Sequence, residues 1–223
     1  MSTITTGRTL DGDGDPIPGT GFEVEPGSWL ADRIRERVGP IQSHPTRSVW
    51  GVPVAADGDT VRTVSVVGGG YGGPPPHYHT QSRERFSVER GELTLELDGR
   101  DRVVTAGETE TVATGVEHSF RADTDDRVLV VTEIDTPGRL RDVLPTLGGL
   151  AHDDDRDPEH PLQQAVIADR LADNTVFTAA DGGVTGLATD LLAPLGRAAG
   201  YRAAYAEYRT PAFWRAHVEQ PSI

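Results

Sequence analysis

Four residues in the middle of the chain, His77, His79, Glu84 and His118, have types and a spacing that suit the binding of a metal ion. His77 and His79 are two positions apart, so on a β-strand both imidazoles point to the same face. The four residues between His79 and Glu84 are enough for a bend into a neighbouring strand. His118 lies further along the chain and would come from a third strand.

The expected position of Glu84 in an apolar interior needs an explanation. Glu84 has the same parity as Phe86 and Val88, so the strand face that buries these side chains also carries the carboxylate. A buried ionised carboxylate is costly unless it is paired or bound to a metal. His118 shares its parity with Phe120 and can reach the same interior. We therefore expect three imidazoles and one carboxylate to surround one cation, rather than to be four unrelated surface or core residues.

This ligand set indicates which ions could bind. The chain has no cysteine, so thiolate ligands are excluded. Imidazole nitrogens with one carboxylate suit a divalent transition metal (Fe, Mn, Ni, Co, Cu or Zn) and suit Ca²⁺ or Mg²⁺ poorly. In an octahedral site, two positions would stay open for substrate or water, which favours a catalytic site over a purely structural one. The residues leave the identity of the metal open.

The segments around these residues have the pattern of short β-strands. Between residues 46 and 136, runs rich in Val and Thr alternate with turn compositions such as ADGD, ERG and DGRD. Many short strands without intervening helices indicate a closed antiparallel sandwich or barrel. We predict a mainly β fold with a barrel at residues 46–136.

Both flanks of the barrel differ from it in composition. Residues 1–45 predict an N-terminal arm that is extended or partly disordered up to about residue 28, with a short helix at Ser28–Val38. Residues 137–223 predict a helical C-terminal extension, with three helices at about 138–200 and an aromatic tail from Tyr201 that docks on another surface. The acidic run HDDDRDPEH and the remaining histidines (His44, His152, His160 and His217) are expected to be solvated.

The composition narrows the partners and the setting. The formal net charge is −14, from 35 acidic and 21 basic residues, and every basic residue is arginine. Such an acidic excess argues against nucleic acid as a partner. Acidity together with the loss of lysine predicts a halophilic source, although a GC-rich genome would also favour arginine. No run approaches the roughly 20 apolar residues of a membrane span. The N-terminus lacks a signal-peptide pattern, and we expect a cytoplasmic protein.

Residues 70–122 resemble the two sequence motifs of the cupin superfamily. The first motif is Gly, five residues, His-x-His, three or four residues, Glu, six residues and Gly. The segment from His77 to Gly91 matches it without a gap, and Tyr71 stands at the leading Gly. In the second motif Gly107, Gly115 and His118 match, whereas Ala113 and Ala122 replace a Pro and an Asn. The wider stretch is similar to single-domain cupins of the quercetin-dioxygenase-like group.

The resemblance implies a double-stranded β-helix, the cupin jelly-roll barrel, with the metal bound by His77, His79, Glu84 and His118. It also implies that Glu84 can act as a general base when it detaches from the ion. We expect a dioxygenase-type oxidoreductase for a small substrate with an enol, phenol or diketone group, and we expect a homodimer. Two alternatives stay open. One is a metal-dependent isomerase, lyase or epimerase that does not use dioxygen, and the other is a non-catalytic module that binds a small ligand.

Overall fold

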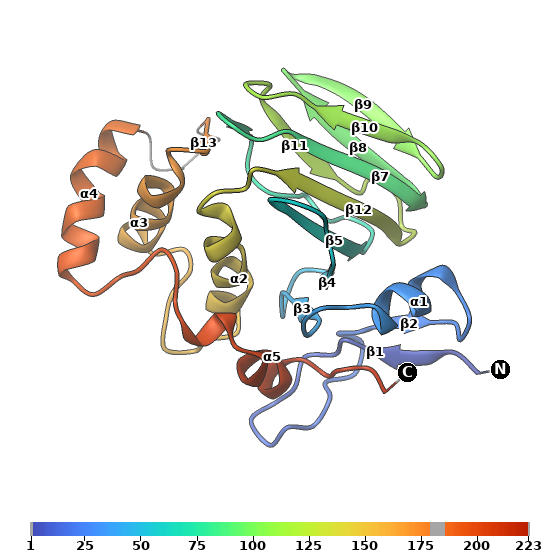
Figure 1. Cartoon of the computed structure of the whole chain (residues 1–223). Coiled ribbons are helices and arrows are strands. Elements are labelled where there is room, and N and C mark those ends of the chain that lie inside the picture. The colour runs from blue at the N-terminus through green and yellow to red at the C-terminus, as the bar shows by residue number, and fades with distance from the viewer. Residues whose placement is uncertain (1, 179–185, 223) are drawn as a thin grey trace.

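Two β-sheets face each other across an apolar core, and most of the helices lie beside one end of this barrel (Figure 1). The computed structural model describes residues 2–178 and 186–222. The strands are β1 (Ile4–Thr6), β2 (Phe22–Val24), β3 (Gln42–Ser43), β4 (Val49–Val54), β5 (Thr60–Val67), β6 (His77–His79), β7 (Glu84–Arg90), β8 (Glu92–Leu97), β9 (Arg100–Thr105), β10 (Thr109–Val112), β11 (His118–Arg121), β12 (Val128–Asp135) and β13 (Thr175–Phe177). The helices are α1 (Trp29–Arg35), α2 (Leu140–Ala151), α3 (Pro161–Leu171), α4 (Gly186–Ala198), the 3₁₀ turn η1 (Glu207–Arg209) and α5 (Pro211–His217).

The strands form the two sheets of a jelly roll. One sheet has the order β10-β7-β12-β5-β4-β3 and the other has the order β13-β6-β11-β8-β9, with antiparallel neighbours throughout. Side chains that alternate inward along β7, β8 and β12 fill the space between the sheets; among them are Phe86, Val88, Leu93, Leu95 and Val130. The predicted mainly β fold with a jelly-roll barrel and C-terminal helices is confirmed.

The turn between β8 and β9 shows how local sequence sets the strand pairing. Asp98 and Gly99 both have positive φ angles, 47° and 72°. Such a pair forms the two-residue hairpin turn whose twist matches that of the flanking strands, and Asp-Gly is a favoured sequence for it. The turn pairs Leu97 with Arg100 and places Leu93 and Leu95 on the buried face.

The N-terminal segment is more ordered than the sequence predicts. β1 and β2 pair with each other, and Phe22 is completely buried against Trp50. The helix α1 is also shorter than the predicted span of residues 28–38. Ser28 caps its N-terminus by accepting a hydrogen bond from the Ala31 amide. The helix ends early because the backbone of Arg37 forms a β-bridge with Val54 of β4. This contact with a distant strand outweighs the local helical pattern.

The C-terminal extension contains α2, α3 and α4, close to the three predicted helices. The structure also shows what the aromatic tail contacts. Trp214 is buried in the cluster formed by the N-terminal segment and β4, and the Glu219 amide pairs with the Arg8 carbonyl. The two ends of the chain therefore pack together on the side of the barrel that carries β3 and β4.

The acidic run after α2 is not fully solvated as predicted. Asp153 and Arg156 are half-buried rather than fully solvated. The completely buried Tyr208 donates its hydroxyl hydrogen to Asp153 and accepts a hydrogen bond from Arg156, at 2.5 and 2.7 Å. These contacts attach η1 to the loop between α2 and α3.

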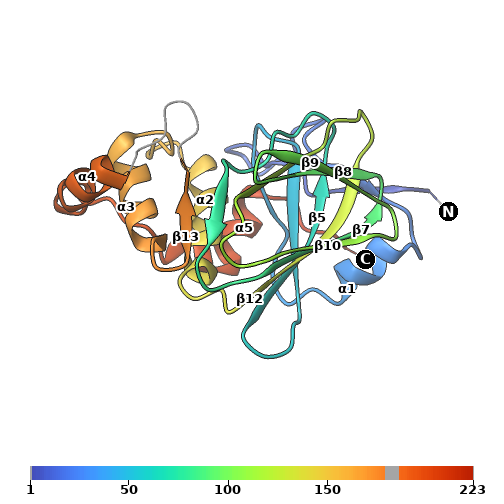
Figure 2. The same cartoon turned by 90° about the horizontal axis from the view of Figure 1, so that it is seen from above.

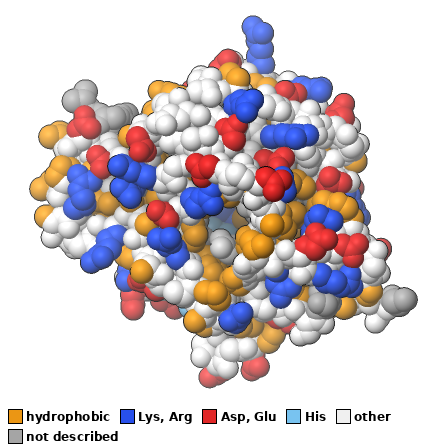
Figure 3. Space-filling view, in the orientation of Figure 1, with side chains coloured by type: hydrophobic (Ala, Val, Ile, Leu, Met, Phe, Trp, Pro, Cys, Tyr) orange, Lys and Arg blue, Asp and Glu red, His pale blue; other side chains and the backbone are white. Residues whose placement is uncertain are grey.

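Acidic and arginine side chains are interspersed over the face of the molecule shown in Figure 3. Among the described helices, none is both long and apolar enough to cross a membrane. The cytoplasmic location and the homodimer stay predictions.

Candidate metal centre

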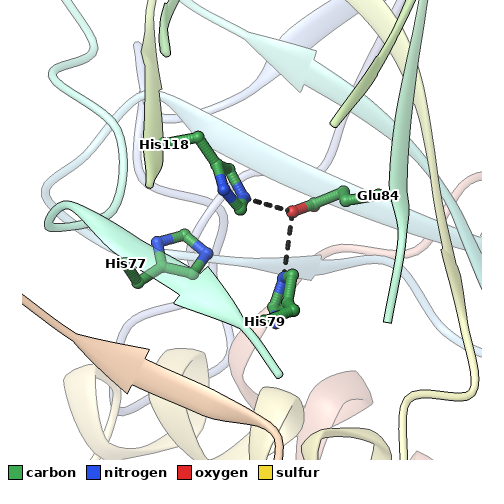
Figure 4. Close-up of side chains that lie close together, drawn as sticks. All are labelled: His77, His79, Glu84 and His118. Carbon is green, nitrogen blue, oxygen red and sulfur yellow. Dashed lines mark hydrogen bonds and ion pairs between the residues drawn. The ribbon is translucent and has the colours of Figure 1, made fainter. Parts of the chain in front are cut away.

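Three strands bring the four predicted ligands together inside the barrel. His77 and His79 come from β6, Glu84 begins β7 and His118 begins β11. His118 lies directly opposite His77 in the pairing of β11 with β6. Figure 4 shows that the four side chains point toward a common centre. All four residues are at most 8% exposed.

The carboxylate of Glu84 lies between two of the imidazoles. Its Oε2 atom is 2.9 Å from Nε2 of His118 and 3.2 Å from Nε2 of His79 (Figure 4). The ring of His77 is 4.4 Å from that of His118 and 5.2 Å from that of His79, measured between centroids. One potential ligand atom from each of the four residues lies within 4.8 Å of the others.

Hydrogen bonds at the Nδ1 atoms of two histidines determine which ring nitrogen is free to bind a metal. Nδ1 of His77 lies 2.9 Å from the carbonyl oxygen of Pro75, and Nδ1 of His118 lies 3.0 Å from that of Val116. A carbonyl oxygen only accepts hydrogen bonds, so both rings must carry a proton on Nδ1. In a neutral ring, the lone pair is then on Nε2. This hydrogen bonding prepares both imidazoles to bind a metal through Nε2.

The pKa values reflect this crowded, buried arrangement. Burial, together with the neighbouring His118, lowers the pKa of His77 to about 4, so His77 is neutral at physiological pH. Burial alone would raise the pKa of Glu84, but the contacts with His118 and His79 outweigh it and lower the pKa to about 2. Burial also disfavours a charged His118, yet the adjacent Glu84 carboxylate raises its pKa above the ordinary value.

The chemistry of this donor set fits a metal ion. If His118 is neutral, its Nε2 lone pair faces an ionised carboxylate oxygen at 2.9 Å, and these two groups repel unless a proton or a cation lies between them. Bonds of about 2.1 Å to one ion place adjacent octahedral ligands about 3 Å apart. The contacts of 2.9 and 3.2 Å agree with that spacing. His77, His79, Glu84 and His118 would therefore hold one divalent transition metal.

The two glycines that match the second motif sit at turns around the centre. Gly107 and Gly115 both have positive φ angles, 88° and 83°, which side-chain-bearing residues rarely adopt. The Gly115 amide donates to the carbonyl oxygen of His79 and so ties the turn before His118 to β6. Ala122, which replaces the motif's Asn, is buried, and its backbone pairs with Gly70 and Tyr71. The replacements of the motif's Pro by Ala113 and of its Asn by Ala122 leave all four candidate ligands in place.

Two residues beside the centre were missed in the sequence analysis. Thr175 lies 3.0 Å from Nδ1 of His79, and the ring of Phe177 lies 5.8 Å from that of His77. Both belong to β13, a strand of three residues that is too short to produce a periodic signal. Only the pairing of β13 with β6, almost 100 positions earlier in the chain, reveals their place.

The other histidines lie apart from the centre, and all four are half-buried rather than solvated as predicted. His152 is half-buried, and burial lowers its pKa to about 4. It donates from Nε2 to the carbonyl oxygen of Ser43 and packs edge-on against Trp214. His160 caps α3, whereas His217 donates to the Phe213 carbonyl near the end of α5.

Comparisons with known proteins agree with this fold. Residues 63–135, from β5 to β12, match the family model described as "Cupin domain", and this segment contains all four candidate ligands. No curated protein matches the chain by sequence.

Solved structures with similarity to the chain include three proteins from different organisms. KdgF from Halomonas sp. is 20% identical, with a TM-score of 0.37, over 41% of this chain and 83% of its own. A predicted oxalate decarboxylase from Thermotoga maritima is 16% identical, with a TM-score of 0.39, over 44% and 91%. A sugar phosphate isomerase from Silicibacter pomeroyi is 17% identical, with a TM-score of 0.37, over 50% and 66%.

Proposed function

We propose, from the premise that residues 63–135 are a domain of the cupin superfamily, that the chain is a metal-dependent oxidoreductase of the dioxygenase type. Its substrate would be a small molecule with an enol, phenol or diketone group. The observation that carries the proposal is the buried convergence of three imidazoles and one carboxylate beside aromatic side chains. A bound transition metal would supply a Lewis acid for a substrate oxygen and a route for electrons to dioxygen.

Aromatic rings pack against the ligands, and these apolar surroundings favour a weakly polar substrate. Phe86 lies edge-on to His118 at 6.5 Å, and Phe120 packs against Phe86 at 5.6 Å. Phe177 lies on another side, 5.8 Å from His77. Pockets with mostly apolar walls and a few convergent polar groups orient a ligand through those polar groups and bind its body by apolar contact.

The charges around the site favour a substrate without phosphate or several carboxylates. Among the described residues, burial, the other members of the cluster and a backbone carbonyl account for the pKa shifts of His77, Glu84 and His118. Among the described residues, no arginine is one of the main causes of these shifts. Phosphate and carboxylate groups are usually bound by arginine or lysine. An enol, phenol or diketone needs no such partner.

Glu84 has a proposed second role as proton acceptor. Its Oε2 atom faces the same centre as the imidazole nitrogens, so a substrate hydroxyl that reaches this centre lies beside a carboxylate. Because the contacts with His118 and His79 lower its pKa to about 2, Glu84 is ionised but is a weak base. It would therefore accept the proton of an acidic hydroxyl, such as that of an enol or phenol, more readily than that of an alcohol.

Oxygen consumption tests this proposal. The metal-loaded protein is incubated with a 1,3-diketone, a flavonol and a catechol in an oxygen-electrode cell. We expect oxygen uptake that matches substrate loss for at least one class and disappears in His118→Ala. Conversion of a substrate at the same rate without oxygen would refute the dioxygenase reaction and favour an isomerase or lyase. Loss of none of the substrates would contradict the proposed substrate class.

A further inference from the structure

Strand β13 of the C-terminal extension lies beside the strand that carries two of the candidate ligands. It pairs antiparallel with β6, with Thr175 opposite His79 and Phe177 opposite His77. Directly paired residues on neighbouring strands point to the same face of a sheet. Thr175 and Phe177 therefore face the same side as the two imidazoles. Figure 4 shows this strand, in pale orange, alongside β6.

Several hydrogen bonds fix β13 in this place. The Thr80 amide donates to the Asn174 carbonyl at 2.7 Å, and the Thr178 amide donates to the Pro76 carbonyl at 3.0 Å, so both ends of the pairing are closed. The side chain of Asn174 is buried and donates to Ser82 and to the Pro137 carbonyl. The position of the Thr175 hydroxyl is thus set by the fold and not by a free loop.

The three imidazoles differ in what orients them. His77 and His118 donate from Nδ1 to carbonyl oxygens two residues earlier in their own segments. His79 instead contacts the Thr175 hydroxyl at 3.0 Å, a residue 96 positions away. A hydroxyl can accept a hydrogen bond from Nδ1–H, which leaves the Nε2 lone pair directed to the centre. Thr175 therefore provides for His79 what the local backbone provides for the other two rings.

We propose that β13 completes the metal centre, with Thr175 as the positioning residue of His79 and Phe177 as the apolar cover of His77. This inference rests on the proposed metal site. It makes the C-terminal extension a part of the site and not only an appendage of the barrel. Groups that orient a ligating histidine typically change metal affinity by about 10- to 100-fold when they are removed.

Three variants test the role of Thr175. Thr175→Val keeps the shape of the side chain and removes the hydroxyl, and Thr175→Ser keeps the hydroxyl. Thr80→Val is the matched control, because the hydroxyl of Thr80, the residue after β6, also donates to the extension, at the Asp173 carbonyl at 2.7 Å, and has no hydrogen bond to an imidazole among the described residues. The dissociation constant for Mn²⁺ is measured by competition with a chelator. The visible absorption spectrum of the Co²⁺-loaded protein reports the ligand geometry.

We expect Thr175→Val to bind Mn²⁺ about 10- to 100-fold more weakly and to have an altered Co²⁺ spectrum. Thr175→Ser and Thr80→Val should stay close to the unaltered protein. If the unaltered protein binds Mn²⁺ and Thr175→Val binds it equally well, the inference about β13 is wrong and the metal site stands. If Thr80→Val weakens binding as much as Thr175→Val, general loosening of the extension explains the result and the inference is also wrong. If the unaltered protein binds neither ion, the proposed metal site itself is refuted.

Discussion

Replacement of Glu84 by Gln is the sharpest test of how the charge of the site contributes to metal binding. Gln has nearly the same shape and keeps an oxygen that could bind an ion, but it has no negative charge. Glu84 is 6% exposed, and its Oε2 atom lies 2.9 and 3.2 Å from two imidazole nitrogens, so solvent compensates little for the lost charge. We expect Glu84→Gln to fold and to lose most of its affinity for a divalent cation.

The size of this loss follows from the burial of the charge. The removal of one partner from a buried, closely paired set of charges costs about 3–5 kcal/mol. At 1.4 kcal/mol per factor of ten, this corresponds to a dissociation constant that is roughly 100-fold to several thousand-fold higher. The smaller value applies if the Gln oxygen still binds the ion.

A titration of Mn²⁺ against a fluorescent chelator measures the loss, and Glu89→Gln is the matched control. Glu89 lies on the same strand, is exposed, and its replacement changes the net charge by the same amount. We expect Glu89→Gln to bind like the unaltered protein. The reasoning is refuted if Glu84→Gln binds Mn²⁺ within about threefold of the unaltered protein, because that ratio is worth less than 1 kcal/mol.

Three further predictions follow from the structure. Metal affinity should fall by about tenfold per pH unit as the pH falls through the raised pKa of His118, because the ion must displace the proton that His118 then carries. His77 takes up a second proton only near its pKa of about 4. A pH-independent dissociation constant between about pH 5 and 7, measured by chelator competition, would contradict this sign. Tyr208→Phe should lower the free energy of unfolding by about 1–2 kcal/mol in urea denaturation, because the contacts with Asp153 and Arg156 are lost; unchanged stability would show that these bonds contribute nothing. Because the net charge is −14, the melting temperature should rise from about 0.1 M to about 2 M NaCl, as screening weakens self-repulsion; a lower melting temperature in high salt would argue against a halophilic protein.

The cluster of three histidines and one glutamate could be predicted from the sequence because its geometry depends on local rules. Successive side chains of a strand point to opposite faces of the sheet. The spacing of His77 and His79 and the shared parity of Glu84 with Phe86 therefore already place three ligands on interior faces. The Asp98–Gly99 turn is likewise encoded by two residues. These features need no knowledge of distant contacts.

The features that the sequence left open depend on contacts between distant segments. β13 exists because it pairs with β6, and its three residues carry no periodic signal of their own. The end of α1 is set by the bridge from Arg37 to β4, and the site where the tail docks is set by the burial of Trp214. Tertiary packing decides such elements, and local propensity does not.

The metal content of the purified protein is the most direct test of the proposed metal site. The protein is purified without added metal or chelator and is analysed by elemental mass spectrometry beside His118→Ala, with circular dichroism to verify that both are folded. We expect about one equivalent of a divalent transition metal per chain in the unaltered protein and a large loss in His118→Ala. Full metal content in folded His118→Ala, or an unaltered protein that neither contains nor takes up such a metal, would contradict it.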